Sequence, residues 1–162
     1  MSPTPTPPNS SPMDTDLGLV DALAQLTFAV QGALGRIAAE NGLSIIQTRL
    51  LGILRDREPT IKELAGFLQL DKSSVTGLVD RAHERGLVRR RASATDGRSV
   101  HVHITATGRA LLERETATFE EEIAILVSDL SPTDRSRLST LASLVAVADA
   151  KRRGTDILAV PD

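Results

Sequence analysis

Two short helical patterns separated by a three-residue turn constrain this fold more than any other feature of the sequence. Apolar residues at 61, 64, 65 and 68 predict a helix over 61–68, and a second apolar stripe predicts a helix over 72–85. The turn between them, residues 69–71, has the length found in a helix-turn-helix, whose second helix enters the major groove of DNA. The spacing therefore predicts a DNA-reading helix at 72–85.

The ends of the central helices are marked by side chains that can bond the free backbone amides of a first turn. Ser44 with Gln47, and Thr60 with Glu63, have the spacing of capping boxes. Asp71 is a favourable N-cap for the helix at 72–85, and Gly86 is a favourable left-handed end for it. We expect helices over 44–57, 61–68 and 72–85.

Two short strand-like runs follow these helices. They cover residues 87–91 and 99–104, and in the second run Val100, Val102 and Ile104 alternate with polar residues. The polar segment 94–98 supplies a turn between them. The expected fold is therefore mainly α with a small β-hairpin wing, and a winged helix-turn-helix domain is predicted over 43–104.

Long amphipathic helices flank the central domain, with patterns over 15–39, 105–128 and 131–150. The central domain cannot cover all of their apolar stripes. The regions 15–42 and 105–153 are therefore expected to form a helical dimerisation region with a second copy of the chain. Residues 1–14, rich in Pro, Ser and Thr, are expected to be a disordered tail, and residues 154–162 a loose C-terminal tail.

Charge is distributed unevenly along the chain, although the net charge is only −2. Residues 72–98 hold seven basic and three acidic residues, whereas residues 105–150 hold four basic and eight acidic ones. A basic region confined to the predicted hairpin and its preceding helix indicates a local DNA-facing surface. The chain has three Phe and no Trp or Tyr, so binding of single strands by base stacking is not supported.

Several other functions lack the residues they need. Without cysteine there is no disulfide or thiolate zinc site, and His83, His101 and His103 have no carboxylate cluster or cysteine joined to them. No metal or cofactor is therefore expected. The sequence has no nucleophile–base pairing or glycine-rich phosphate loop, so no enzyme is predicted. It also has no secretory signal and no apolar run of membrane-spanning length, which favours the cytoplasm.

The polar face of helix 72–85 carries small side chains that suit a DNA groove. Hydroxyl groups can reach base edges or phosphates. An exposed glycine in mid-helix costs about 0.5–1 kcal/mol relative to alanine, so Gly77 indicates close approach to DNA, with neutral drift as the alternative. An arginine at a hairpin tip can enter the minor groove. The candidate DNA-binding residues are Lys72, Ser73, Ser74, Thr76, Gly77, Arg81, Arg89, Arg90, Asp96 and Arg98.

These segments together resemble the MarR family of bacterial transcription regulators. The resemblance is carried by LAGFLQLDKSSVTGLVDR (64–81), ERGLVRRR (84–91), DGR (96–98) and ITATG (104–108), within about residues 15–150. It implies a homodimer held by the first and the last two helices. It also implies that Ser73, Ser74, Thr76 and Arg81 face DNA and that Asp96 and Arg98 form the acid–arginine pair of the wing. Gly77 and Gly97 stand where many members of the family have larger residues. The resemblance therefore implies that Arg98 and DNA shape contribute more to recognition, and base contacts of the helix less.

The resemblance further implies a small aromatic or anionic effector, bound between the dimerisation helices and the winged domain. Candidate pocket residues are Phe28, Gln31, Arg49 and Phe119, although a core or surface position explains each of them better. The predicted function is sequence-specific binding of double-stranded DNA, as a repressor released by a small ligand, at a pseudo-palindromic operator with half-sites about 10 base pairs apart. The alternatives are a winged-helix dimer that acts as a protein-interaction module and a ligand-independent DNA-binding protein.

Overall fold

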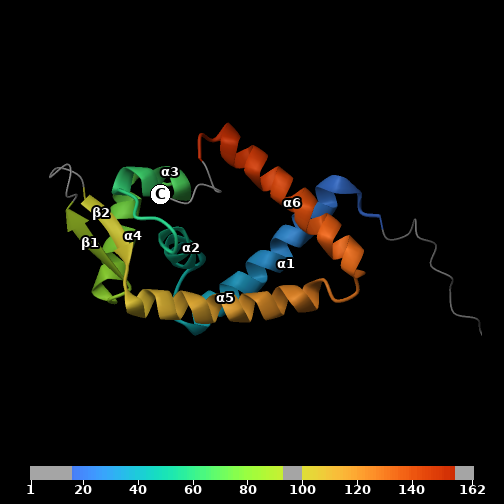
Figure 1. The fold of residues 1–162 in the computed structure, drawn as a ribbon, viewed down its shortest axis with the longest axis horizontal. Coiled ribbons are helices and arrows are strands. Elements are labelled where there is room, and N and C mark those ends of the chain that lie inside the picture. The colour runs from blue at the N-terminus through green and yellow to red at the C-terminus, as the bar shows by residue number, and fades with distance from the viewer. Residues whose placement is uncertain (1–15, 93–99, 156–162) are drawn as a thin grey trace, which may run out of the picture. The chain divides into compact units, whose positions relative to one another are not determined.

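The computed structural model describes residues 16–92 and 100–155, which form helices and one antiparallel hairpin (Figure 1). The chain divides into two compact units, residues 1–32 and 33–162. The predicted order of elements and the winged-helix fold are confirmed. The elements are α1 (Gly18–Glu40), α2 (Ile45–Leu54), α3 (Ile61–Leu68), α4 (Lys72–Glu84), β1 (Val88–Ala92), β2 (Val100–Ile104), α5 (Ala106–Leu126) and α6 (Pro132–Arg152).

The predicted caps start α2, α3 and α4. Both capping boxes are complete, and the Asp71 carboxylate accepts the backbone N–H of Ser74. However, α2 ends at Leu54, three residues before the predicted end at 57. The linker after it is drawn to the hairpin, because the carbonyl of Pro59 accepts the N–H of Val102 at 2.9 Å. This long-range bond has no signal in the local sequence.

The core of the winged domain is built from α2, α3, α4 and the hairpin. The predicted inward face of α4 is confirmed, since its buried residues are Val75, Leu78, Val79 and Ala82. Full burial of a Val or Leu side chain contributes roughly 1.5–3 kcal/mol, so this face fixes the rotation of α4 and turns its other side outward. The largest fully buried side chains are Leu50, Leu51, Leu54, Leu64, Leu78, Val75, Val79, Val88 and Val102.

The start of α5 is fixed to the end of α4 by close backbone contact. The Thr105 hydroxyl donates to the carbonyl of Gly86 at 2.7 Å and accepts the N–H of Gly108 at 3.0 Å. A side chain at position 108 would clash with the backbone carbonyl of Leu87. Gly108 is therefore required by packing, and it holds the first turn of α5 against the winged domain.

The register of the hairpin decides where its arginines point. Arg89 pairs with His103 and Arg91 with His101, so these four side chains share one face and Arg90 lies on the other. The predicted apolar alternation of β2 holds at Val102, which is buried. It does not hold at Val100, which is 40% exposed, or at His103, which is 6% exposed.

One carboxyl group is buried where α5 packs on the winged domain. Glu115 is 3% exposed, and neither of its oxygens has a hydrogen-bond partner in the described part of the chain. Burial raises the pKa of this carboxyl, because the charged form loses its hydration. The nearby Thr48 hydroxyl and the Arg114 and Arg85 guanidinium groups offset only part of that effect.

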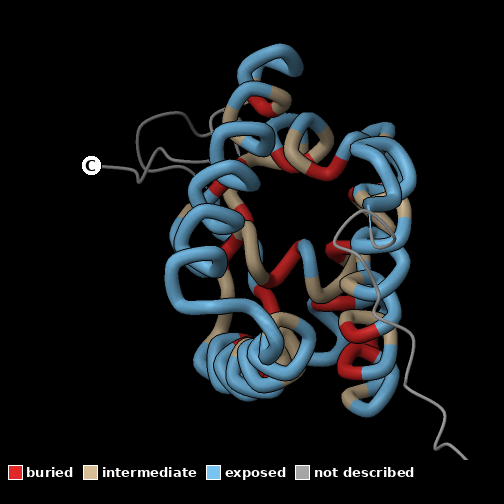
Figure 2. Tube along the Cα trace, turned by 90° about the vertical axis from the view of Figure 1, so that its right-hand side faces the viewer, coloured by how far each residue is buried: buried red, intermediate tan, exposed pale blue. Residues whose placement is uncertain are grey.

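The long helices expose much of their apolar surface, and Figure 2 shows that exposed residues make up most of the outer turns of the chain. Within α6 the buried residue is Ala150, whereas Leu141, Leu144 and Val145 are each at least 60% exposed. Exposed apolar stripes of this kind mark interaction surfaces. The division into a winged domain and a dimerisation region stays a prediction. Within residues 16–92 and 100–155, no helix is both long and apolar enough to cross a membrane.

Candidate nucleic-acid interface

The outward side of α4 presents hydroxyl groups that already donate hydrogen bonds within the chain. Ser73 and Ser74 donate to the two carboxylate oxygens of Asp71 at 2.5 and 2.6 Å, and Thr76 donates to the carbonyl of Lys72 at 2.8 Å. The hydroxyl oxygens thus face outward mainly as acceptors. DNA phosphates offer only acceptors at neutral pH, so these hydroxyls must rotate before they can bind a phosphate.

Asp71 keeps a negative charge at the start of α4. The hydrogen bonds from Ser73 and then Ser74 hold the pKa of this carboxyl well below its usual range. The carboxylate also lies at the positive end of the helix dipole, which stabilises its charge. It therefore opposes the approach of a phosphate to the free backbone amides of this helix terminus.

Four of the predicted DNA-binding residues line one hollow of about 350 Å³ on this helix, namely Ser73, Ser74, Gly77 and Arg81. A Cβ atom at Gly77 would meet Arg81 Nη1 at 3.5 Å, which is ordinary van der Waals contact. The fold therefore does not require glycine at position 77. Packing within the chain therefore does not explain the glycine. The two explanations that remain are close approach of a partner and neutral drift.

Arg90 is paired within the chain. Its Nη1 lies 2.6 Å from Oδ1 of Asp80 on the outward side of α4. Both side chains are partly exposed, so the pair contributes roughly 0–1 kcal/mol. It joins β1 to α4 and orients the hairpin relative to the helix. Contact of Arg90 with DNA stays a prediction, and it requires exchange of Asp80 for a phosphate.

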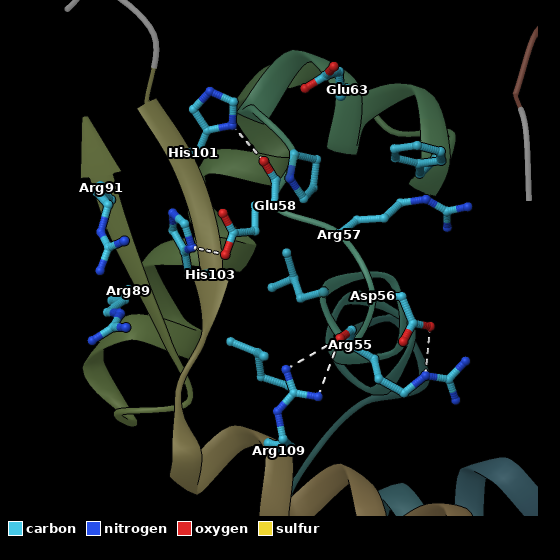
Figure 3. Close-up of a pocket in the computed structure, with 14 residues that line it drawn as sticks. Arg55, Asp56, Arg57, Glu58, Glu63, Arg89, Arg91, His101, His103 and Arg109 are labelled. Carbon is cyan, nitrogen blue, oxygen red and sulfur yellow. Dashed lines mark hydrogen bonds and ion pairs between the residues drawn. The ribbon is translucent and has the colours of Figure 1, made fainter. Parts of the chain in front are cut away.

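Arg89 and Arg91 line a different site, on the far face of the hairpin from Arg90 (Figure 3). This cavity of about 670 Å³ lies between the hairpin, the segment 54–59 and the first turn of α5. Here His101 Nδ1 lies 2.5 Å from the carbonyl oxygen of Glu58, and His103 Nδ1 lies 2.7 Å from its carboxylate. Sequence reasoning missed Glu58, which lies 43 residues from His101 in the chain and has no local signal.

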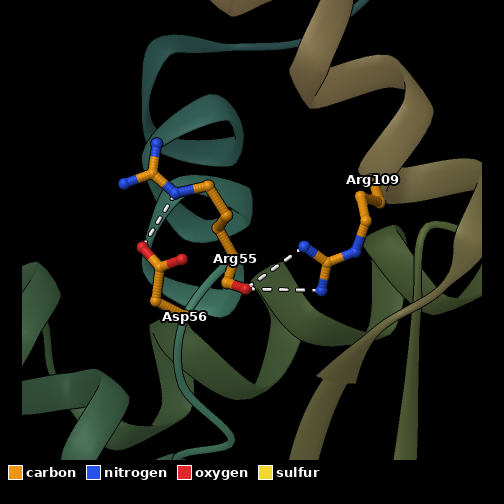
Figure 4. Close-up of polar contacts among 3 residues, drawn as sticks. All are labelled: Arg55, Asp56 and Arg109. Atoms are coloured by element: carbon orange, nitrogen blue, oxygen red, sulfur yellow. Dashed lines mark hydrogen bonds and ion pairs between the residues drawn. The ribbon is translucent and has the colours of Figure 1, made fainter. Parts of the chain in front are cut away.

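The wall formed by α5 is held by Arg109 (Figure 4). Its two terminal nitrogens donate to the carbonyl of Arg55 at 3.3 Å each, and the Arg55 side chain pairs with Asp56 at 2.8 Å. The residues around this cavity do not suggest a metal centre. In the described part of the chain, no group of three His, Cys, Asp or Glu side chains is placed to hold a metal ion.

The remaining predicted site residues lie in several separate parts of the chain. Asp96 and Arg98 lie outside the described residues. Phe28 and Gln31 are exposed in the unit of residues 1–32, and Phe119 is half-buried. Arg49 donates to the carbonyl of Phe67 at 2.9 Å and lines a hollow of about 140 Å³ without Phe119. A pocket formed by all four residues stays a prediction.

Comparison with known proteins gives the relatives of this chain. A sequence model of the MarR family matches residues 41–99, the region that carries α2, α3, α4 and β1. Over this region the chain is similar to the MarR family. The HTH-type transcriptional regulator PecS of Dickeya dadantii (strain 3937) is 24% identical over 131 residues, which are 78% of this chain and 79% of PecS.

Solved structures of similar proteins share the fold of this chain. CouR from Rhodococcus jostii RHA1, solved with p-coumaroyl-CoA bound, is 24% identical with a TM-score of 0.66, covering 85% of this chain and 96% of CouR. A mutant of S. aureus MepR, solved bound to an oligodeoxyribonucleotide, is 21% identical with a TM-score of 0.59, covering 81% of this chain and 98% of MepR. These likenesses extend beyond the winged domain to the long helices.

Proposed function

We propose that this chain is a homodimeric transcription regulator of the MarR family that binds double-stranded DNA and represses transcription until a small ligand releases it. The observation that carries the proposal is the outward side of α4. One side of this helix is buried in the core, and the other lines a hollow with Ser73, Ser74, Gly77 and Arg81. MepR, which shares the fold, was solved with DNA bound.

In this proposal the outward side of α4 enters the major groove. Lys72 and Arg81 supply positive charge for backbone phosphates, while the oxygens of Ser73, Ser74 and Thr76 face the base edges. Gly77 lets the helix backbone approach the DNA. The wing residues Asp96 and Arg98 are assigned to the minor groove by their sequence alone. Arg89, on the far face of the hairpin, has the weakest claim to a DNA contact.

The exposed apolar stripes of α5 and α6 support the homodimer. Ile125, Leu126, Leu141, Leu144 and Val145 are all exposed in the single chain, and a second copy would cover them. Two copies related by a two-fold axis place two α4 helices in successive major grooves. The proposed operator is therefore a pseudo-palindrome with half-sites about 10 base pairs apart.

A ligand-responsive regulator is supported by CouR, whose structure holds p-coumaroyl-CoA. A DNA-binding protein that needs no ligand is the second candidate, because the hollow lined by Arg49 does not include Phe119. We also propose that the chain acts in the bacterial cytoplasm, where its DNA lies, and that it has no catalytic activity.

The salt dependence of DNA binding tests the proposal. Affinity for duplex DNA is measured over a range of KCl concentrations for the wild type, Arg81→Ala and Arg98→Ala. Each variant is expected to bind more weakly and to lower the salt slope by about one ion per site. Arg137→Ala is the control, because Arg137 lies on α6 with a side chain that is 74% exposed.

Affinity and salt slope that stay at wild-type values in both variants would contradict the proposed interface. A folded dimer that binds no duplex DNA would instead favour a protein-interaction module.

A further inference from the structure

We propose that the cavity on the far face of the hairpin binds a small polyvalent anion that carries phosphoryl or carboxylate groups. We call it the anion pocket and define it by Arg89 and Arg91 of β1, His101 and His103 of β2, Arg109 of α5 and the segment 54–59. Only the regulatory consequence of this binding rests on the proposed function.

Basic side chains from two elements line this cavity, and Figure 3 shows Arg89 and Arg91 on β1 and Arg109 on α5. Arg89 and Arg91 point to the same face of β1 because side chains alternate along a strand, and their Cα atoms are about 7 Å apart. Arg109 enters from the first turn of α5. The register places His103 and His101 directly opposite the two strand arginines.

The acidic side chains of the pocket already have partners. Asp56 pairs with Arg55, the Glu58 carboxylate lies 2.7 Å from His103, and Glu63 accepts the N–H and hydroxyl of Thr60 at 2.7 and 2.8 Å. None of these three carboxylates is paired with Arg89, Arg91 or Arg109, and the five arginines that line the cavity outnumber them.

Arg89 and Arg91 of β1 and Arg109 of α5 have no acidic partner in the described part of the chain. Within residues 16–92 and 100–155, the Arg89 and Arg91 side chains form no hydrogen bond or ion pair, and Arg109 bonds only the uncharged carbonyl of Arg55. Three guanidinium groups thus line one cavity, and in the described part of the chain none of them is paired with a carboxylate. An anion that accepts their N–H groups supplies the missing charge.

The size and lining of the pocket indicate the class of ligand. Its volume of about 670 Å³ lies within the range of small-molecule sites, roughly 300–1,000 Å³. Among the described residues on its walls, Phe67 is the one phenylalanine, and it lies under the Arg57 guanidinium, 5.2 Å from ring centroid to Cζ. The remaining lining is mainly charged. A compact ligand with two or more anionic groups fits these walls better than an apolar aromatic ring.

Binding there would connect the DNA-reading hairpin to a long helix. An anion shared by Arg91 and Arg109 ties β1 to the first turn of α5, alongside the linker that follows α2. The same hairpin is joined to α4 by the Arg90–Asp80 pair. Occupancy of the pocket would therefore change the position of the hairpin relative to α5, and with it the affinity for DNA.

The test is calorimetric titration of the full chain with pyrophosphate, and separately with citrate, at constant ionic strength and without DNA. The variants are Arg89→Gln/Arg91→Gln and the single Arg91→Gln, with Arg137→Gln on α6 as a control for loss of one exposed arginine. Thermal unfolding confirms that each variant is folded. We expect at least one probe to bind the wild type and the control equally, and the double variant at least tenfold more weakly.

Two results would overturn the inference. One is that neither probe binds the wild type. The other is that probe binding is unchanged in the double variant. If that variant also loses DNA affinity and salt slope, the arginines serve the DNA backbone. Because the titration contains no DNA, a chain that binds the probe but no duplex would leave this inference intact and contradict only the proposed function.

Discussion

Gly77→Ala separates contact with DNA from stability of the fold. The new Cβ would lie 3.5 Å from Arg81 Nη1, which requires no shift of the backbone. Alanine in mid-helix is more favourable than glycine by about 0.5–1 kcal/mol. We therefore expect the free energy of unfolding to rise by this amount, and the midpoint of thermal unfolding to rise by about 2–4 °C per kcal/mol for a chain of this size.

The same methyl group should weaken DNA binding if α4 lies deep in the groove. An extra carbon in a closely packed contact costs about 1–3 kcal/mol, which is roughly a 5–150-fold loss of affinity. Fluorescence anisotropy with a labelled duplex at fixed salt measures the affinity, and calorimetric unfolding measures the stability.

Gly108→Ala is the matched substitution, because its Cβ would clash with the backbone carbonyl of Leu87 and should lower stability. Unchanged DNA affinity in Gly77→Ala would show that the glycine reflects drift and would refute the close-approach reasoning. Lower stability in Gly77→Ala would refute the packing argument.

Three further predictions follow from other contacts. Asp80→Asn removes a negative charge from the outward side of α4 and releases Arg90, so DNA affinity and the salt slope should both increase in anisotropy titrations; a decrease in either would contradict this assignment. Because the pKa of Glu115 is raised, the folded chain keeps that proton to higher pH than the unfolded chain, and wild-type stability should fall as pH rises from 4.5 through the raised pKa. Urea unfolding at several pH values should show this fall reduced in Glu115→Gln and unchanged in the exposed control Glu113→Gln, and equal falls in all three proteins would refute it. Leu144→Glu places a charge on the exposed stripe of α6, so sedimentation should show a monomer where the wild type is a dimer, and a wild type that is a stable folded monomer would contradict the proposed interface.

Most elements of the fold could be predicted because their signals are local. The capping boxes at Ser44 and Thr60, the N-cap at Asp71 and the glycine after α4 each act within four residues of a helix end. The apolar stripe of α4 repeats with the helical period, so its buried face followed from the sequence alone.

The contacts of the hairpin could not be predicted because they depend on strand register and on distant partners. A run of three arginines, Arg89 to Arg91, indicates positive charge but not which face each side chain occupies. The pairing of Arg90 with Asp80 and of His103 with Glu58 became visible only when the linker and α4 were placed beside the hairpin. The outward face of α4 could thus be proposed from the sequence, whereas the roles of the strand arginines required the fold.

The central claim is that two copies of this chain read double-stranded DNA through paired α4 helices. Selection of bound duplexes from a random pool tests it most directly, because binding, symmetry and spacing are read in one measurement. We predict an enriched pseudo-palindrome whose half-sites are centred about 10 base pairs apart. A pool that remains unenriched, or enrichment of a single half-site without symmetry, would contradict the claim.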